Sequence, residues 1–413
     1  MRYLFETLGC RCNQFETAAM ETELKRRGHE IVAENADVVV INGCAVTAES
    51  TRKSRQAARR LLKKNPGAKL AVCGCWPQAE SAEALALEPA LVGGSGKRGE
   101  FVEALCRLGE GTVNLLDAPR ERTCFEPLPP ARLEGRTRAF LKLEDGCENY
   151  CAYCIIPFLR GRVRSLPPEQ LREQVEALRE SGIRELILTG IELASYEYGL
   201  ENAVMQIAAL APELRIRIGS LEPRVITEEF CRKLSAVSGF CPHFHLSLQS
   251  GCDETLLRMG RRYNTAEFAE SVRLLRQYFP NCNLSCDLIT GFPGETEEEF
   301  EQTLRFVRDC RFAHCHVFPY SERRGTRATL MEGSVPKAVR EHRAQRVIAE
   351  TAEDEAAFLR AQVGSVCEVL FESRVGRTPN DCETELFPGM EGQIRCVKII
   401  GVKNGKLMID SEY

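Results

Sequence analysis

Nine consecutive residues hold three cysteines at a spacing that suits metal chemistry. The segment Gly146-Cys147-Glu148-Asn149-Tyr150-Cys151-Ala152-Tyr153-Cys154 contains a CxxxCxxC pattern and follows a predicted strand. Three thiolates at this spacing can bind three irons of a four-iron cluster and leave the fourth iron open to a substrate. Two plainer interpretations are three thiols on an irregular loop and a zinc site that lacks one ligand. The cluster is favoured by the spacing, by the Ile155-Ile156-Pro157 that follows, and by the position of the motif after the first strand of a barrel that the sequence predicts over 137–357.

A second set of three cysteines lies nearer the N-terminus, each just after a predicted strand. Cys10 follows the predicted strand Tyr3-Leu4-Phe5, Cys44 follows the apolar run 37–42, and Cys75 follows the run 69–73. Ligands bind beyond the carboxyl ends of the strands in an open parallel sheet, so these thiols can converge on one point. Buried cysteines in a Rossmann-like fold are the plainer interpretation.

Alternating strands and helices predict an α/β protein with three domains. Residues 1–120 predict a Rossmann-like parallel sheet with a basic helix over 50–64, and the proline-rich segment 121–136 predicts a linker. Six βα units over 137–357 predict a partial (β/α)6 barrel, with strands at 139–143, 185–189, 214–218, 243–248, 283–289 and 315–318. Alternation in 365–371 and 392–399 predicts a small OB-like β-barrel over 358–413.

Composition excludes several classes of protein. The chain has 413 residues, 44% hydrophobic and 28% charged, which is ordinary globular composition. No apolar run approaches the roughly 18 residues that span a bilayer, and the first residues lack the apolar core of a secretory signal. We therefore expect a cytoplasmic protein without a membrane partner. The 20 cysteines are about 5% of the chain, below the roughly 8–10% of disulfide scaffolds, so they remain available for iron or for packing.

Basic residues cluster on a chain whose net charge is −4. Residues 50–79 contain eight Lys or Arg and no Asp or Glu. Such a cluster is compatible with RNA binding, although a solvated helix face explains it equally well. The candidate phosphate contacts are Lys53, Arg55, Arg160 and Arg162.

The cysteine motifs and their neighbours resemble the methylthiotransferase branch of the radical S-adenosylmethionine superfamily, including its TRAM-like tail. In the central part the resemblance rests on 146–165, Thr189-Gly190-Ile191-Glu192, 220–223, 247–251, 287–294 and 318–321. In the N-terminal part it rests on 7–17, 41–47 and 73–78. The superfamily binds S-adenosylmethionine at the open iron and cleaves it to a 5′-deoxyadenosyl radical.

The resemblance implies two 4Fe–4S clusters with different tasks. A radical-generating cluster would use Cys147, Cys151 and Cys154, and an auxiliary cluster that presents the methylthio group would use Cys10, Cys44 and Cys75. S-adenosylmethionine would serve as both radical source and methyl donor. Two further cysteines lie where the family has other residues, and we interpret them as extra thiols: Cys12 and Cys73.

The same resemblance suggests residues that bind the cofactor. Thr189, Gly190 and Glu192 correspond to the loop that holds the methionine amino group. Further candidates are Tyr153, Glu222, Gln249 and Arg261. For Glu222 an ion pair with a nearby arginine is the plainer interpretation. The six histidines show no ligand spacing, and we assign neither them nor any other residue a catalytic role.

The Thr-Leu-Gly-Cys opening and Lys53-Ser54-Arg55-Gln56 resemble enzymes that methylthiolate carbon 2 of threonylcarbamoyladenosine at position 37 of tRNA, next to the anticodon. Sister enzymes act on isopentenyladenosine in tRNA or on an aspartate of a ribosomal protein, and both remain alternatives, as does a non-catalytic iron–sulfur module. The implied partners are the tRNA anticodon loop, an electron donor such as flavodoxin or ferredoxin, and a sulfur source. The tail departs from the family pattern at Asp381-Cys382, so its RNA contacts stay open beside a purely structural role.

Overall fold

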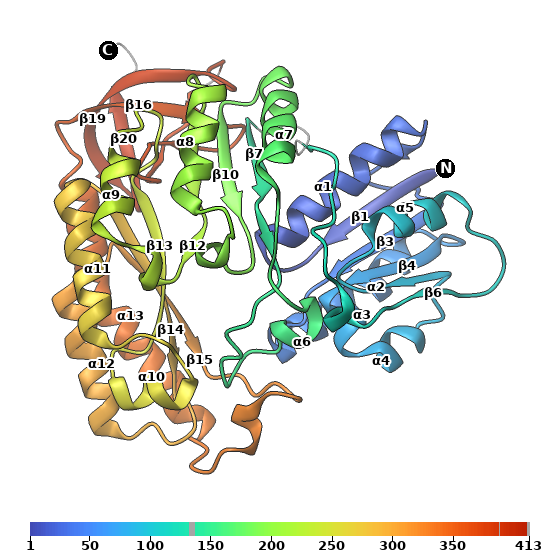
Figure 1. The fold of residues 1–413 in the computed structure, drawn as a ribbon, viewed down its shortest axis with the longest axis horizontal. Helices are drawn as coiled ribbons and strands as arrows, with labels where there is room; N and C mark the ends of the chain where they lie inside the picture. The colour runs from blue at the N-terminus through green and yellow to red at the C-terminus, as the bar shows by residue number, and fades with distance from the viewer. Residues whose placement is uncertain (132–136, 388, 411–413) are drawn as a thin grey trace.

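The N-terminal part of the chain is an open parallel sheet covered by helices on both faces. A computed structural model describes residues 1–131, 137–387 and 389–410. The sheet has the order β2-β1-β3-β4-β5-β6, and every pairing is parallel (Figure 1). Its strands are β1 (Arg2–Thr7), β2 (Glu30–Ile31), β3 (Val38–Gly43), β4 (Lys69–Gly74), β5 (Leu91–Gly93) and β6 (Val113–Leu115). The predicted Rossmann-like sheet is confirmed.

The helices of this part are α1 (Arg11–Arg26), α2 (Ala48–Lys64), α3 (Cys75–Ala79), α4 (Ser81–Leu85) and α5 (Arg98–Cys106). The basic helix predicted over 50–64 is α2, which begins at a capping box formed by Thr47 and Ser50. Every residue of β3 is buried, because one apolar cluster covers each face of the sheet. The carboxyl ends of β1, β3 and β4 therefore meet at one edge.

The central part is a partial barrel of six parallel strand positions, as predicted. It consists of the sheets β11-β10-β7 and β12-β13-β14-β15, joined by a parallel bridge between Ile216 and Phe240. The strands are β7 (Arg138–Lys142), β10 (Glu185–Thr189), β11 (Arg215–Ile218), β12 (Ser220–Leu221), β13 (His243–Gln249), β14 (Asn283–Thr290) and β15 (His314–Pro319). Because β12 continues β11 after Gly219, these seven strands occupy six positions. Two short strands flank the CxxxCxxC loop and pair antiparallel with each other: β8 (Glu144–Asp145) lies before the loop and β9 (Arg164–Ser165) after it.

The helices of the central part are α6 (Ile156–Arg160), α7 (Pro168–Glu180), α8 (Leu200–Leu210), α9 (Glu228–Ser235), α10 (Asp253–Met259), α11 (Thr265–Tyr278), α12 (Glu297–Cys310) and α13 (Lys337–Arg360). Most of them pack against the outside of the barrel, whereas α6 contacts α3 of the N-terminal domain. Among the described residues, no helix is both long enough and apolar enough to cross a membrane. Of the predicted linker, residues 132–136 lie outside the described ranges.

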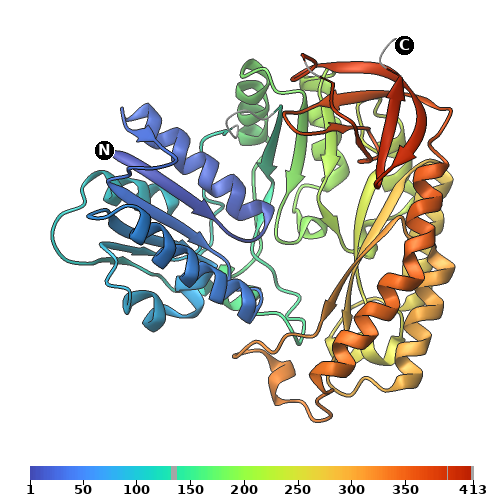
Figure 2. The ribbon, with the colours of Figure 1, turned by 180° about the vertical axis from the view of Figure 1, so that it is seen from behind.

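The C-terminal part is a closed five-stranded barrel, as predicted. Its strands are β16 (Val366–Phe371), β17 (Gly376–Arg377), β18 (Glu383–Thr384), β19 (Ile394–Lys403) and β20 (Lys406–Asp410). It packs against the amino ends of the central strands, where Arg138 pairs with Glu372 at 2.7 Å. Arg217 donates to the carbonyl of Pro379 at 3.0 Å. Figures 1 and 2 show this barrel far from α6, at the opposite end of the central strands from the CxxxCxxC loop.

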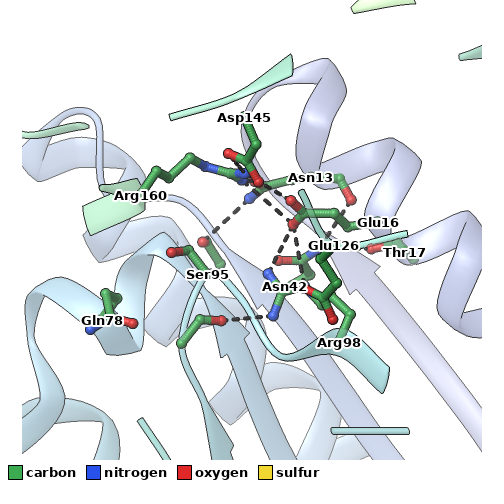
Figure 3. Close-up of polar contacts among 12 residues, drawn as sticks. Asn13, Glu16, Thr17, Asn42, Gln78, Ser95, Arg98, Glu126, Asp145 and Arg160 are labelled. Carbon is green, nitrogen blue, oxygen red and sulfur yellow. Dashed lines mark hydrogen bonds and ion pairs between the residues drawn. The ribbon is translucent and has the colours of Figure 1, made fainter. Parts of the chain in front are cut away.

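A buried ionic centre joins the N-terminal sheet domain to the central barrel (Figure 3). Glu16 of α1 pairs with Arg98 of α5 at 2.8 Å, with Arg160 of α6 at 2.8 Å and with Lys142 of β7 at 3.3 Å. Asp145 also pairs with Arg160, at 2.9 Å. Burial alone would raise the pKa of Glu16, but Arg160, Arg98 and Lys142 lower it to about 2. We call Glu16, Arg98, Lys142, Asp145 and Arg160 the Glu16 centre.

Replacing Glu16 should destabilise the fold strongly. Glu16→Gln leaves three buried cations short of a carboxylate, a change that typically costs roughly 3–5 kcal/mol. The Glu16 contribution is fully present above its unfolded pKa of 4.5 and is lost as the pH falls toward 2. Urea unfolding at pH 7 measures the loss. Glu23→Gln on the same helix removes a partly exposed pair with Arg27 and should cost about 0–1 kcal/mol. Equal losses in the two variants would contradict a structural role for the centre.

Candidate functional site

The CxxxCxxC loop closes on itself at a glycine. A Cβ built on Gly146 would lie 1.9 Å from the carbonyl oxygen of Arg162, and the residue has φ +96°, so a side chain does not fit there. Cys147 donates its backbone N–H to the carbonyl of Gly161 at 3.1 Å, and Cys154 donates to that of Cys151 at 3.0 Å. These bonds hold the three thiols on one compact loop.

The three N-terminal cysteines lie at one edge of the sheet, as predicted from the strand ends. Cys10 precedes α1, Cys44 follows β3, and Cys75 begins α3. A Cβ built on Gly9 would lie 2.7 Å from Cys44 Cβ and 2.9 Å from Cys44 Sγ. Only glycine therefore lets the Cys10 loop approach Cys44 this closely.

The two cysteine groups face each other across a small apolar cluster. Cys75 packs there with Ile155 and Ile156, and the partly buried Cys147 and Cys154 border the same cluster. In the described part of the chain, no three His, Cys, Asp or Glu side chains lie close enough to hold a single metal ion. A four-iron cluster is wider than one ion and binds each thiolate through a different iron, so two separate sets of three thiols suit it.

Cations next to each thiol group suit an anionic cluster. Arg261 donates to Cys151 Sγ at 3.1 Å. A hydrogen bond from Cys12 lowers the pKa of Cys10 to about 6, and Arg160 acts in the same direction against the effect of burial. Burial raises the pKa of Cys75 and of Cys154 to about 12, so iron must displace protons from both.

The loop after β10 is bound to the CxxxCxxC loop through Glu192. Asn149 donates to Glu192 Oε2 at 3.0 Å, and the backbone N–H of Glu192 donates to Glu144 Oε2 at 2.6 Å. A Cβ built on Gly190 would lie 2.9 Å from that same Glu144 oxygen. Burial, reinforced by Glu222, raises the pKa of Glu192 to about 7. Neither Asn149 nor Glu144 was predicted as a site residue, although the charged pair Glu144-Asp145 after an apolar strand is a signal for Glu144.

The other predicted cofactor residues surround the same loop. Glu222 pairs with Arg261 at 2.9 Å, so the structure contains the ion pair that the plainer interpretation expected. Arg261 thereby connects Glu222 to Cys151. Thr189 ends β10 with its hydroxyl 3.9 Å from Cys12 Sγ. Gln249 adopts a left-handed backbone with φ +67° at the end of β13.

An apolar cavity of about 300 Å³ is lined by Cys154 of the CxxxCxxC group and by Val46 and Thr47, which follow Cys44 of the N-terminal group. Residues of the N-terminal domain and of the central barrel line it together: Val46, Thr47, Tyr153, Cys154, Ile155, Ile156, Gln249, Asp287, Ile289, Phe318, Pro319, Tyr320 and Ser321. Phe318 is 51% exposed and Val46 48% exposed, which leaves apolar surface for a planar group. The volume and lining suit one nucleobase.

The predicted phosphate contacts do not form one surface. Arg160 has no solvent exposure, because its guanidinium belongs to the Glu16 centre, so the prediction that it contacts RNA is wrong. Lys53 and Arg55 lie on α2 and pair with Glu49 and Glu83. Arg162 is exposed beside the CxxxCxxC loop.

Comparisons with known proteins agree with this geometry. Residues 142–307 match the Radical SAM superfamily, and residues 2–94 match Uncharacterized protein family UPF0004. Threonylcarbamoyladenosine tRNA methylthiotransferase MtaB of Bacillus subtilis is 35% identical over 97% of this chain and 92% of that protein. tRNA-2-methylthio-N(6)-dimethylallyladenosine synthase of Caldicellulosiruptor saccharolyticus is 32% identical over 97% and 86%. The radical S-adenosylmethionine methyltransferase TsrM of Kitasatospora setae shares the fold, with a TM-score of 0.58 at 15% identity over 78% of this chain and 74% of that one.

Cys10 should be the most reactive thiol of the six candidate ligands in iron-free protein. With a pKa of about 6 it is largely thiolate at pH 6.5, whereas Cys75 stays protonated and buried. Iodoacetamide labelling followed by peptide mass spectrometry should find Cys10 modified first. Cys12→Ser should slow the reaction, because Cys12 supplies the largest stabilisation of the thiolate. The exposed Cys124 is the reference thiol. If Cys10 reacts no faster than Cys124, the lowered pKa of Cys10 is contradicted.

Proposed function

Because the chain belongs to the radical S-adenosylmethionine tRNA methylthiotransferase family, we propose that it attaches a methylthio group to carbon 2 of N6-threonylcarbamoyladenosine at position 37 of tRNA. The substrate follows the name of the Bacillus subtilis relative, a threonylcarbamoyladenosine tRNA methylthiotransferase that is 35% identical to this chain. The observation that carries the proposal is an apolar cavity lined by Cys154 and by the segment after Cys44, next to the cluster in which Cys75 meets Ile155 and Ile156.

The chemistry explains why two clusters are needed. Carbon 2 of adenine carries neither an acidic proton nor a leaving group, and the bound cluster with S-adenosylmethionine supplies a one-electron route past that barrier. Cys147, Cys151 and Cys154 would hold the cluster that binds S-adenosylmethionine. Cys10, Cys44 and Cys75 would hold the auxiliary cluster. The assignment of two clusters rests on two complete sets of three thiols.

The surrounding residues position these groups and exclude water. Arg261 neutralises charge at Cys151 and is itself oriented by Glu222. Asn149 and Glu192 fix the loop after β10 beside the CxxxCxxC loop, where the methionine end of the cofactor would lie. Ile155 and other apolar residues of the cavity keep water from a reactive intermediate.

The reaction needs partners beyond the chain. A base in the anticodon loop must be splayed out to reach the cavity, so the substrate is a folded tRNA or its stem-loop. An electron donor such as flavodoxin or ferredoxin would reduce the clusters, and a sulfur source would recharge the auxiliary one. All of these are available in the cytoplasm, where we place the protein.

Dimethylallyladenosine is the second candidate substrate. The 32% identity to a dimethylallyladenosine synthase over 97% of this chain favours the same chemistry on a different N6 substituent. The two substrates are distinguished by the modified nucleoside that disappears from tRNA when the gene is deleted.

Deleting the gene should remove methylthio-threonylcarbamoyladenosine from tRNA and leave methylthio-isopentenyladenosine unchanged. Mass spectrometry of digested tRNA measures both nucleosides, and re-expression of the wild-type chain should restore the first. Loss of the isopentenyl nucleoside instead would assign the sister substrate. If neither nucleoside changes, the ribosomal-protein aspartate becomes the substrate to test.

Single cysteine variants should separate the two clusters. Cys151→Ala should abolish reductive cleavage of S-adenosylmethionine yet retain about half of the iron, because the auxiliary cluster does not need it. Cys44→Ala should cleave S-adenosylmethionine without forming methylthio product. Iron and sulfide analysis with product chromatography measures both. Loss of all iron in either variant would disprove the two-site assignment.

A further inference from the structure

Arg11 is a cation inside the partial barrel without a carboxylate of its own. It is the first residue of α1, a helix that packs against β7. Its guanidinium lies against the end of β11, where a Cβ built on Gly219 would be 3.7 Å from Arg11 Nη1. Within the described part of the chain, this guanidinium makes no hydrogen bond or ion pair.

The neighbouring guanidinium groups all have acidic partners. Glu185 pairs with Arg217 at 2.8 Å, with Arg215 at 3.1 Å and with Arg138 at 3.7 Å. The acid that acts most strongly on Arg11 is Asp381, which already lies 3.5 Å from Arg217 and 3.4 Å from Arg377. Arg11 therefore experiences the like charges of Arg217, Arg138 and Arg377, offset in part by the Asp381 carboxylate that two other arginines already engage, and a bound anion would relieve the remaining excess of positive charge.

A polar strip of the barrel interior connects Arg11 with the apolar cavity. His316 of β15 interacts electrostatically with Arg11 and is paired in register with Asp287 of β14. Asp287 lines the cavity and lies 3.1 Å from His245 Nε2. A ligand that places a base in the cavity can thus extend a polar substituent along β14 toward Arg11.

Building on the proposed function, we propose that Arg11 binds the free carboxylate of the threonylcarbamoyl group and thereby selects this nucleoside. The threonine is attached through its amine, so its carboxylate is free, whereas a dimethylallyl group is an uncharged hydrocarbon. N6 and carbon 2 flank N1 on the same edge of adenine. Arg11 directly follows Cys10, so a carboxylate held by Arg11 keeps carbon 2 next to the auxiliary cysteine group.

S-adenosylmethionine is the other source of a carboxylate, and its position distinguishes the two. Its methionine end belongs with Cys147, Cys151 and Cys154, on the loop fixed by Asn149 and Glu192. Arg11 lies instead beside Cys10, in the other cysteine group. A site built for an anion discriminates strongly against a neutral analogue, because the cation is otherwise left unpaired.

Binding of anticodon stem-loops to the reconstituted protein tests the proposal. Three RNAs differ only at the target nucleoside, which carries threonylcarbamoyladenosine, its neutral threonine-amide analogue or isopentenyladenosine. Wild-type protein should bind the carboxylate form at least about 10-fold more tightly than the amide, a typical loss for one charged contact. Arg11→Gln should abolish this difference, and Arg11→Lys should keep part of it. Arg26→Gln, at the exposed end of the same helix, is the matched control and should keep all of it.

Each other outcome has a definite meaning. Equal binding of the acid and amide RNAs by wild-type protein overturns the proposal without any variant. A uniform loss of affinity for all three RNAs in Arg11→Gln assigns Arg11 to a backbone phosphate, and weaker binding of S-adenosylmethionine assigns it to the cofactor; both overturn it. Wild-type protein that discriminates the carboxylate yet forms no methylthio product leaves this inference intact and refutes the proposed reaction.

Discussion

The Glu16 centre fixes the relation of the N-terminal domain to the barrel, and the candidate site depends on that relation. One buried carboxylate is shared by cations from α5, β7 and α6, which belong to different domains. Asn13, one turn from Glu16, accepts from Arg160 at 2.8 Å and donates to the carbonyl of Leu8, next to the Cys10 loop. The same contacts that dock the domains therefore also position one cysteine group opposite the other.

A buried ionic centre adds little net stability compared with an apolar interface of the same volume, although removing one of its partners is costly. Each buried charge loses its hydration, and the pairing repays the cost only when the geometry is complete. An apolar interface would allow the domain to slide, whereas Glu16 satisfies its cations in one arrangement only. Glu185 has the corresponding role at the other end of the barrel, where Arg217 connects it to the C-terminal barrel. Buried ion pairs thus join the central barrel to the N-terminal domain at one end and to the C-terminal barrel at the other.

The site also requires close backbone approach, which glycine permits. Gly9 lets the Cys10 loop meet Cys44, Gly146 lets the CxxxCxxC loop meet the carbonyl of Arg162, and Gly190 lets the loop after β10 meet Glu144. A side chain at any of these three positions would force its neighbours to shift. The resulting enclosure brings an apolar cavity and two thiol groups together while Arg261 and Arg160 supply positive charge.

Local sequence pattern was enough to predict the longer strands, their order along the chain and both sets of three cysteines, but not short strands such as β8, β9 and β12. Apolar runs such as 38–41 specify buried parallel strands through local pattern, and cysteine spacing is a local property of one loop or one strand end. Which charges are buried follows only from the tertiary structure. From the sequence, Arg160 is expected to be a surface cation in a basic run and Glu16 an ordinary acid on a helix. Their ion pair joins residues 144 positions apart, and such a pairing leaves no local signal in the sequence. Arg11 likewise differs from the paired arginines only through the carboxylates that the fold brings to them and not to it.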